Sequence, residues 1–350
     1  MTIHQPKLII IADDLTGALD AAAAFCTPQT SVVVATAPEH LNTALEQKPT
    51  VVSVSTQSRE LSEADARTQV TRVMEALKAQ GLLATTLFKK VDSRLKGHVA
   101  AELDVIAQYL PSSAQTNWLV APALPSFERF QEAGFVTGFG VTQPISIANA
   151  LGRYAVRCSL PEVTSHDALS AALAEQPYSL LIGARDLAGA LAKKWQLESH
   201  SPTPLNGNIA LAIGSRDPIT LKQIELLPKS IYQYVAAPSG VASTQDVVAD
   251  ANITLLHATE GKQAVTSAEL DRAFAQSFAP LANHSHSLVL SGGATAEALL
   301  NALEIGVLQL EGELLPGIPV AKGKQWRIAT KSGGFGQPDT LCRLLNVAHS

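Results

Sequence analysis

The chain has 350 residues, of which 46% are hydrophobic and 16% are charged, and its formal net charge is −5. This length is too great for one ordinary core and suits two domains, and the composition is that of a globular protein with a large interior. Because Lys and Arg form no dense stripe, neither a nucleic acid nor an anionic membrane is an expected partner, since both need a concentrated basic face. Positive charge must instead act locally, on a small anion.

The start of the chain is polar and lacks the apolar stretch of a signal peptide. The sequence contains no uninterrupted run of about eighteen apolar residues, so we expect no transmembrane helix. The three cysteines, Cys26, Cys158 and Cys342, lie far apart and follow no metal-ligand spacing, so we expect small buried hydrophobes rather than reactive thiols. These features favour a cytoplasmic location.

Short apolar runs alternate with helical patterns from the beginning of the chain. Runs rich in Val, Ile and Leu predict buried strands at residues 7–12, 31–36, 50–55, 85–91 and 117–121. The clearest helical pattern covers residues 62–80, where Ser62 and Asp65 come close to a capping box. A second helix is expected at 99–109. Such alternation implies parallel strands with helices on both faces of the sheet.

The pattern loosens between residues 123 and 161, where we expect irregular structure and one hairpin around 135–141. Residues 201–208 (SPTPLNGN) form the best linker, because they are dense in residues that stop helices and strands. Thr266 and Glu269 form a capping-box pair before a helix that runs to about residue 282. Further strands are predicted at 178–184, 209–213, 231–237, 287–291 and 327–330. The predicted fold is therefore α/β, with domains at 1–200 and 209–350 that each hold a largely parallel sheet flanked by helices.

Two adjacent carboxylates, Asp13 and Asp14, directly follow the first predicted strand within residues 12–18 (ADDLTGA). Ligands of open α/β sheets gather at the carboxyl ends of the strands. One aspartate could orient or deprotonate a substrate hydroxyl, while the N–H groups of the next helix meet anionic oxygens. The alternative is that an aspartate, Asp14 above all, only caps that helix.

Charged residues also follow two other predicted strands. Arg59 comes after residues 50–55, and an arginine there can hold a carboxylate through two parallel hydrogen bonds. Residues 88–98 (FKKVDSRLKGH) place several charged residues at the end of a predicted strand, and binding of an anionic substrate would explain this concentration of charge. The alternatives are a solvent-exposed loop arginine and salt bridges that cover the edge of the sheet. Strand alternation sends Lys89 and Lys90 to opposite faces, so at most one of them needs to enter the site.

The second half contains three turns rich in Gly or Ser, at residues 214–218, 291–296 and 330–336, each after a predicted strand. Glycines let the backbone approach phosphate oxygens, and helix N-termini favour negative charge. None of the turns matches GxxxxGK[ST] or a GxGxxG after a first strand. Each could be a simple tight turn, but three in one domain indicate a nucleotide-binding cradle.

Taken in order, these motifs resemble the four-carbon acid sugar kinase family, whose members phosphorylate threonate, erythronate or 3-oxo-tetronate with ATP. The resemblance implies an N-terminal substrate domain and a C-terminal nucleotide domain, and it covers nearly the whole chain. The segments that carry it are 12–18, 58–59, 89–93, 122–125, 214–218 with Thr220 and Gln223, 291–296, 312–313, 316–319 and 330–336.

The resemblance also implies the site residues. Those expected around the sugar acid are Asp13, Asp14, Arg59, Lys90, Asp92 and Ser93. Those expected to hold ATP are Ser215, Arg216, Gly292, Gly293, Ala294, Thr295, Gly317, Lys331, Ser332, Gly333 and Gly334. Mg²⁺ is expected on the nucleotide, because phosphoryl transfer needs neutralisation of spreading charge, but no metal ligands are assigned. In our hypothesis Asp13 or Asp14 orients the terminal hydroxyl of the substrate, while Lys90 and Arg59 bind its carboxylate or the transferring phosphoryl group.

Four departures from the family pattern are visible. Ala294 stands where many relatives carry Asp or Glu, and residues 127–130 match the family only loosely. Arg94 and Lys96 make their loop more basic than the common Thr and Arg, and the chain is short between Pro144 and Tyr178. Ala294 and the short middle segment motivate a lapsed family member that binds a ligand or regulates. A phosphosugar lyase or epimerase, with the glycine turns around a substrate phosphate, is a third hypothesis. The sequence fixes neither the acid used nor the oligomeric state, for which a homodimer is one option.

Overall fold

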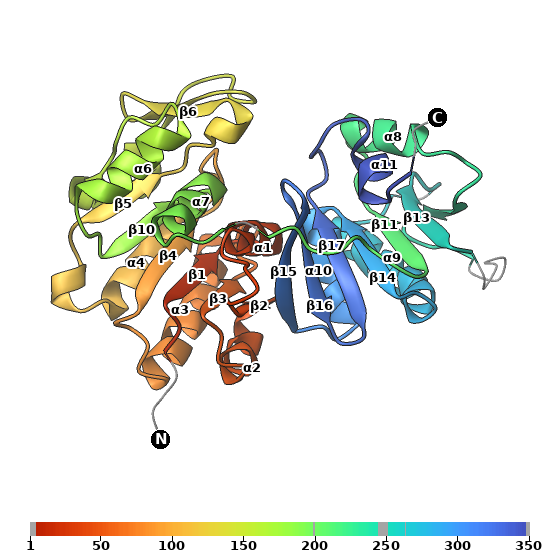
Figure 1. The fold of residues 1–350 in the computed structure, drawn as a ribbon, viewed down its shortest axis with the longest axis horizontal. Coiled ribbons are helices and arrows are strands. Elements are labelled where there is room, and N and C mark those ends of the chain that lie inside the picture. Colours follow the sequence, from red (N-terminus) through yellow and green to blue (C-terminus); the bar gives the residue numbers. More distant parts are fainter. Residues whose placement is uncertain (1–4, 199, 244–250, 263, 348–350) are drawn as a thin grey trace. The chain divides into compact units, whose positions relative to one another are not determined.

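The computed structural model describes residues 5–198, 200–243, 251–262 and 264–347. It divides into two compact units, Met1–His200 and Ser201–Ser350, which we call the N-terminal and C-terminal units. Each unit is a sheet covered by helices (Figure 1). Residues 201–208, the expected linker, contain no helix or strand.

The N-terminal unit is built on a sheet in which every strand pair is parallel, in the order β2–β3–β1–β4–β10–β5–β9. All five residues of β1 are buried, as their unbroken apolar sequence predicts. Ala12 at the end of β1 is in register with Ser55 on one side and Lys90 on the other. The chain segments that leave these three strands therefore start from one edge of the sheet. The strands are β1 (Leu8–Ala12), β2 (Val32–Ala35), β3 (Val51–Ser55), β4 (Thr86–Lys90), β5 (Trp118–Ala121), β9 (Cys158–Ser159) and β10 (Leu180–Gly183).

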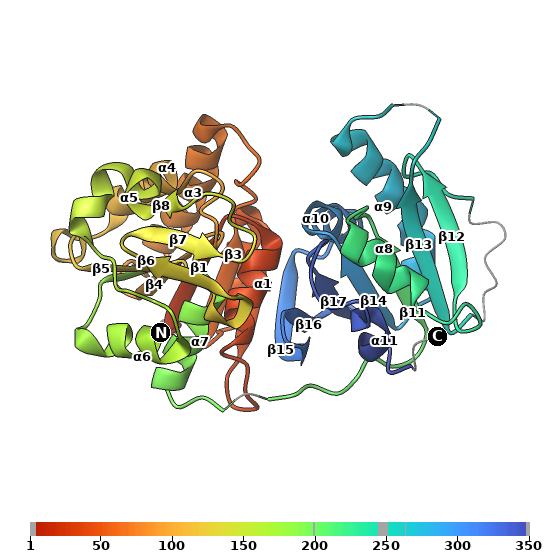
Figure 2. The ribbon, with the colours of Figure 1, turned by 90° about the horizontal axis from the view of Figure 1, so that it is seen from above.

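Helices cover both faces of this sheet, with α3 and α4 on one side and α6 and α7 on the other (Figure 2). The predicted capping of α3 is confirmed, because the Ser62 side chain accepts a hydrogen bond from the Asp65 backbone N–H. The helices are α1 (Leu15–Ala23), α2 (Leu41–Glu46), α3 (Glu63–Ala79), α4 (Val99–Tyr109), α5 (Ile147–Leu151), α6 (His166–Glu175) and α7 (Arg185–Lys194), with short 3₁₀ turns at Pro38–His40, Ser112–Ala114, Pro125–Phe127 and Gly152–Arg157.

A separate three-stranded sheet is formed by β6 (Arg129–Glu132), β7 (Phe135–Gly138) and β8 (Ile145–Ser146). The hairpin expected around 135–141 lies within this sheet, because β7 begins at Phe135 and pairs antiparallel with β8. A tighter hairpin of β6 and β7, which was not predicted, precedes it. Its turn is Ala133–Gly134, which takes positive φ values of 49° and 78°, the conformation of a tight two-residue hairpin. Alanine is not typical of such a turn, so Ala133 did not indicate the hairpin in the sequence.

The C-terminal unit has a sheet of order β12–β13–β11–β14–β17–β16–β15. The first five strands are parallel, and β16 pairs antiparallel with both β17 and β15. Strands β13, β15 and β16 were not predicted. The bounds are β11 (Ile209–Ile213), β12 (Gln233–Pro238), β13 (Ile253–Thr259), β14 (Ser287–Ser291), β15 (Val307–Leu315), β16 (Ile318–Gly323) and β17 (Trp326–Lys331).

Helix α9 packs with α10, and α8 packs with α11 on the other face of the C-terminal sheet (Figure 2). The capping box at Thr266 and Glu269 is present at the start of α9, as predicted. One hydrophobic core joins β11, β13 and β14 to α11 through Leu211, Leu255, Val289 and Leu341. The helices are α8 (Pro218–Glu225), α9 (Ser267–Asn283), α10 (Gly293–Ala302) and α11 (Thr340–Leu344).

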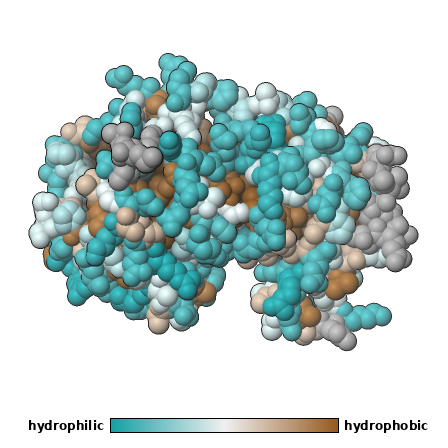
Figure 3. Space-filling view, turned by 90° about the horizontal axis from the view of Figure 1, so that it is seen from below, coloured by the Kyte–Doolittle hydropathy of each residue, from teal (hydrophilic) through white to brown (hydrophobic). Residues whose placement is uncertain are grey.

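Figure 3 shows one face of the molecule, on which hydrophilic residues predominate around smaller apolar areas. Across the described residues, no helix combines the length and apolar character needed to cross a bilayer. Cys26 and Cys342 are buried, as expected, while Cys158 is only half-buried. Burial nevertheless raises the pKa of Cys158 to about 12, which keeps it a thiol at neutral pH.

Candidate functional site

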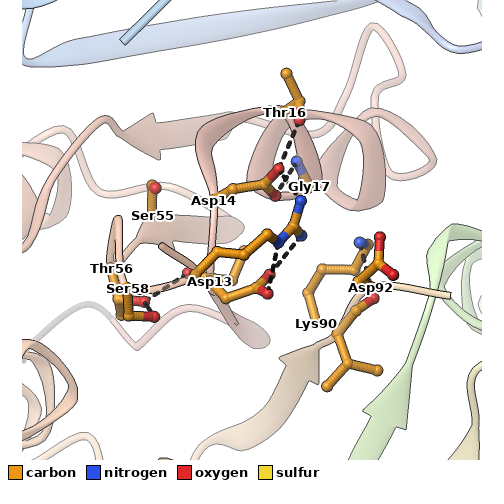
Figure 4. A network of polar contacts seen from close by, with 12 residues as sticks. Asp13, Asp14, Thr16, Gly17, Ser55, Thr56, Ser58, Lys90 and Asp92 are labelled. Atoms are coloured by element: carbon orange, nitrogen blue, oxygen red, sulfur yellow. Dashed lines mark hydrogen bonds and ion pairs between the residues drawn. The ribbon is translucent and has the colours of Figure 1, made fainter. Parts of the chain in front are cut away.

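Asp13, Asp14 and Arg59 meet at the carboxyl ends of β1 and β3 (Figure 4). Arg59 donates from Nε and Nη2 to the two carboxylate oxygens of Asp13, at 2.9 and 2.8 Å. Its Nη1 donates to Asp14 Oδ2 at 2.5 Å. The backbone N–H groups of Ser58 and Arg59 also donate to the Asp13 carbonyl, at 2.9 and 3.2 Å. The strand register therefore brings together three residues predicted from sequence, and the arginine fixes both carboxylates.

Asp14 caps α1, which is the alternative role that the sequence offered for it. It is the N-cap of α1, since its Oδ1 accepts from the Gly17 N–H at 2.8 Å, and its Oδ2 accepts from Thr16 Oγ1 at 2.8 Å. It is also an ion-pair partner of Arg59. A Cβ on Gly17 would lie 2.5 Å from Asp14 Oδ1 and 3.0 Å from Lys90 Nζ, so only glycine fits between these groups.

The charges of this group are strongly coupled. Burial would raise the pKa of Asp13, but the hydrogen bonds from Arg59 and the positive charges of Lys89 and Lys90 outweigh it and lower that pKa. Burial would lower the pKa of Arg59, but its contacts with Asp13 and Asp14 raise it instead. Asp13 is therefore a carboxylate, and Arg59 a cation, throughout the physiological pH range.

The two lysines of β4 separate as strand alternation predicts. Lys90 lies on the side of α1 and is buried, and its Nζ donates to the Val91 carbonyl at 3.0 Å. Lys89 points to the opposite face, where its Nζ lies 2.6 Å from Glu102 Oε2 of α4. Figure 4 shows Lys90 beside Asp92 and close to the two aspartates. Only one lysine is thus available to the site.

A fully buried polar network supports the site from beneath. Ser58 donates to Glu102 Oε1, lies 2.7 Å from Thr56 Oγ1, and so joins α4 to the end of β3. Thr56 Oγ1 donates to the Ala12 carbonyl at 3.0 Å, one residue before Asp13. Glu102 was not predicted as part of this region, because nothing in the sequence of a helix reveals a buried lysine partner.

Asp92 and Ser93 lie in the loop between β4 and α4. Asp92 Oδ1 accepts from the Arg94 backbone N–H at 2.9 Å, and Asp92 is half-buried. Ser93 is buried and accepts a hydrogen bond from Nη1 of Arg129, the first residue of β6. Sequence reasoning missed Arg129, although it lies in the segment 127–130 that we noted as a loose family match.

The three glycine- or serine-rich turns of the C-terminal unit follow β11, β14 and β17, which are neighbours in the sheet. The Gly214 N–H donates to the Ser291 carbonyl at 3.2 Å, and the Gly292 N–H donates to the Lys331 carbonyl at 2.9 Å. A Cβ on Gly214 would lie 1.9 Å from Thr295 Oγ1, so the first two turns pack too closely for any side chain there.

The third turn packs as closely against the first. A Cβ on Gly333 would lie 2.8 Å from Ser215 Oγ, and one on Gly334 would lie 2.6 Å from Asp217 Oδ2. The structure thus brings together most of the residues predicted to hold ATP. In these turns Arg216, Ala294 and Ser332 are exposed. Gly317 lies instead in the turn between β15 and β16, where its N–H donates to Glu313 Oε1 at 2.9 Å.

These turns fit an anionic nucleotide in two respects. Helix α10 begins after Gly292 without any side-chain cap, so the N–H groups of its first turn can meet phosphate oxygens. Ser291 Oγ is buried and makes no hydrogen bond among the described residues. A polar atom left unpaired in this way is costly unless a ligand or water satisfies it.

Lys331 is directed into the third turn. Its Nζ donates to the carbonyls of Ser332, Gly333 and Phe335 at 3.0, 2.7 and 3.2 Å, and Thr220 Oγ1 donates to the Gly333 carbonyl at 2.5 Å. Burial lowers the pKa of Lys331 to about 8, against the opposing charge of Asp217. The ammonium therefore holds the turn in shape from its inner side.

The sequence matches two family descriptions that divide the chain in the same way as the structure. Residues 8–146 match a sugar-binding N-terminal domain, and residues 210–341 match a nucleotide-binding C-terminal domain. The chain belongs to the four-carbon acid sugar kinase family. The expected family resemblance is thereby confirmed, and the aspartate group of this family member lies in its sugar-binding part.

Two relatives match this family member over nearly their whole length. A D-threonate kinase from Cupriavidus necator is 28% identical, with 95% of this chain and 96% of the relative covered. A D-threonate kinase from Bordetella bronchiseptica is 26% identical, with 97% and 96% covered. Two solved structures share the fold. One from Salmonella typhimurium LT2 has a TM-score of 0.71 at 18% identity and covers 96% of this chain and 98% of its own. One from Haemophilus influenzae has a TM-score of 0.70 at 19% identity and covers 97% of this chain and 99% of its own.

Proposed function

We propose that the chain is an ATP-dependent kinase that phosphorylates the terminal hydroxyl of a sugar acid of about four carbons, such as threonate, erythronate or 3-oxo-tetronate. The observation that carries this proposal is the group of Asp13, Asp14 and Arg59 at the carboxyl edge of the N-terminal sheet. Relatives named D-threonate kinase support the substrate class. The packed glycine turns of the C-terminal unit support a nucleotide as the second substrate.

In this proposal Asp13 orients the hydroxyl that attacks the phosphorus. Its lowered pKa makes it a weak base, which suits a loose transition state in which the hydroxyl proton leaves late. Arg59 holds Asp13 and Asp14 in place through three hydrogen bonds. Lys90, buried beside the start of α1, places a positive charge near the transferring phosphoryl group. Positioning and charge, rather than proton abstraction, then lower the barrier.

The nucleotide phosphates would be held by Gly292, Gly293 and Thr295 at the start of α10, with Ser215 from the first turn and Gly333 from the third. Mg²⁺ would supply neutralising charge on those phosphates. In the part of the chain that the structure describes, no group of three or more His, Cys, Asp or Glu could hold a metal ion. In our proposal Mg²⁺ lies on the nucleotide, where it commonly keeps phosphate and water as ligands.

The test is a coupled ADP-release screen with ATP–Mg²⁺ over D- and L-threonate, D- and L-erythronate, 3-oxo-tetronates and glycerate. We expect turnover with at least one of these acids. Silence across the panel from folded protein would overturn the kinase proposal. In that case a thermal shift with ATP alone would favour a lapsed ligand-binding member, and a shift with sugar phosphates alone would favour a lyase or epimerase.

A further inference from the structure

Two arginines of the N-terminal unit, Arg94 and Arg129, lie beside the loop that follows β4. Neither takes part in any ion pair formed by the described residues. Arg59, by contrast, is fully engaged with Asp13 and Asp14. Arg94 and Arg129 are each half-buried, so they are partly removed from water without a carboxylate to compensate.

Arg129 is held in a fixed orientation by neutral acceptors. Its Nε and Nη2 donate to the Phe139 carbonyl at 3.1 and 2.8 Å, and its Nη1 donates to the Ser93 hydroxyl. Arg94 Nη1 reaches the Gly140 carbonyl in the same hairpin loop, at 3.5 Å. A Cβ on Gly140 would lie 3.2 Å from Arg129 Nη2, so the loop packs closely on the guanidinium. The two arginines therefore converge on residues 139–140.

The charge distribution around Arg129 is unfavourable without an anion. Burial lowers the pKa of Arg129, the charge of Arg94 lowers it further, and Asp92 only partly opposes them. Asp92 also contributes to the raised pKa of Arg59. A Cβ on Gly97, later in the same loop, would lie 3.2 Å from Asp13 Oδ2, so the loop that carries Ser93 and Arg94 packs against the aspartate group.

We propose that Arg129, Arg94 and the Ser93 hydroxyl bind the carboxylate of the sugar acid, while Asp13 meets its hydroxyl end. Ser93 accepts from Arg129 and so keeps its own proton to donate to a carboxylate oxygen. Ser93 lies three residues beyond Lys90, which is in register with Ala12, so both ends of a short substrate face one sheet edge. This subsite rests on the proposed function and takes over the carboxylate role that the sequence suggested for Arg59.

The test compares wild-type protein with Arg129→Gln and Arg94→Gln, using the acid found in the screen and its uncharged primary amide. Kinetics with ATP–Mg²⁺ and calorimetric binding of the acid to the full chain are both measured. We expect each variant to weaken binding of the acid and raise its KM by about 10- to 100-fold, as loss of a charge-assisted hydrogen bond implies. The amide and the nucleotide should bind the variants as they bind wild type.

Arg72→Gln is the matched control, because Arg72 is an exposed arginine of α3 whose Nη1 donates to Gln69 Oε1 of the same helix, at 3.4 Å. Should Arg129→Gln unfold, Arg94→Gln keeps the proposal testable, because among the described residues the Arg94 side chain makes a single hydrogen bond, at 3.5 Å. Unchanged acid binding by folded Arg94→Gln and Arg129→Gln variants of an active kinase would overturn the subsite alone, as would equal losses for acid and amide. A wild-type chain that neither binds nor phosphorylates any acid would overturn the proposed function and the subsite together.

Discussion

Arg59 donates two hydrogen bonds to Asp13, one to each carboxylate oxygen, at 2.8 and 2.9 Å. This paired geometry helps to keep the buried carboxylate charged, because the arginine contacts and the charges of Lys89 and Lys90 together outweigh the cost of burial. The positive charge of Arg59 also offsets part of the negative charge of Asp13 and Asp14, which would otherwise repel the anionic substrate that we propose.

Replacing Arg59 should shift the pH dependence of the reaction. The pKa of Asp13 is lowered in the folded enzyme, so activity that needs the carboxylate is lost only at low pH. In Arg59→Gln burial acts without the arginine, and the pKa of Asp13 should rise. We expect the acid limb of the kcat profile to move to higher pH and the neutral-pH rate to fall at least about 100-fold. An acid limb at its wild-type position would contradict this role.

Asp13→Asn and Asp14→Asn should have separable effects. Asp13→Asn is expected to lower kcat by about 10²- to 10⁴-fold and also to lower the free energy of unfolding, because Arg59 then loses the buried carboxylate that it holds through two hydrogen bonds. Asp14 is also the N-cap of α1, but Asn caps helices well, so Asp14→Ala should cost about 1 kcal/mol more than Asp14→Asn in the free energy of unfolding. Turnover assays and urea unfolding measure the two effects. If both Asn variants turned over at the wild-type rate, the hydroxyl-orienting role would be wrong.

Lys331 should link nucleotide binding to pH. Its pKa of about 8 in the folded chain means that it loses its charge in mildly alkaline solution. Nearby phosphate charge would raise that pKa, so nucleotide binding should take up a proton above pH 8 and weaken as the pH rises from 7.5 to 9.5. Calorimetry in buffers of different ionisation enthalpy measures the proton uptake. Lys331→Arg should bind with little pH dependence, and a flat wild-type profile would refute the link.

The ion pair of Lys89 and Glu102 should contribute to stability only as a pair. Both side chains are fully buried, with 0% and 1% exposure, so removing one leaves an uncompensated charge. We expect Glu102→Gln or Lys89→Met to lower the free energy of unfolding by about 3–5 kcal/mol. The double variant should lose clearly less than the sum of the two. Additive losses in urea unfolding would show that the partners act independently.

Gly214 should tolerate no side chain. Its Cβ would lie 1.9 Å from Thr295 Oγ1, so Gly214→Ala must push the first two turns of the proposed nucleotide cradle apart. We expect at least about a tenfold loss of ATP affinity, equivalent to about 1.4 kcal/mol. Gly189→Ala is the control, because nothing lies within 4 Å of a Cβ there, and a helix-interior alanine should stabilise by about 0.5–1 kcal/mol. Equal ATP affinities for the two variants would contradict the close packing.

The sheet edge that holds Asp13, Arg59 and Lys90 could be predicted because parallel strands end together, and an apolar strand followed by charge is visible in sequence. Strands β15 and β16 could not be predicted, because Gly312, Pro316 and Gly317 interrupt the apolar pattern of the sequence. The two strands pair antiparallel with register shifts, and sequence patterns carry little information about such irregularities.

Residues whose role depends on a distant partner were also missed. Arg129 contacts Ser93 only because the turn at Ala133–Gly134 sets the β6–β7 hairpin beside the β4–α4 loop. Glu102 contacts Lys89 and Ser58 through packing of α4 on the sheet, which leaves no mark on spacing. The direction of the Lys331 side chain, which points into the third turn, is likewise set by tertiary packing and could not be predicted from the motif.

Position 14 joins the folding of α1 to the chemistry of the site, since one carboxylate both begins the helix and pairs with Arg59. In a saturation library, Asn should therefore be the substitution that best preserves abundance at residue 14, because asparagine also caps helices. At residue 13, any uncharged substitute deprives Arg59 of a buried carboxylate, so abundance and turnover should fall together. Adjacent and chemically identical residues would then face different selection.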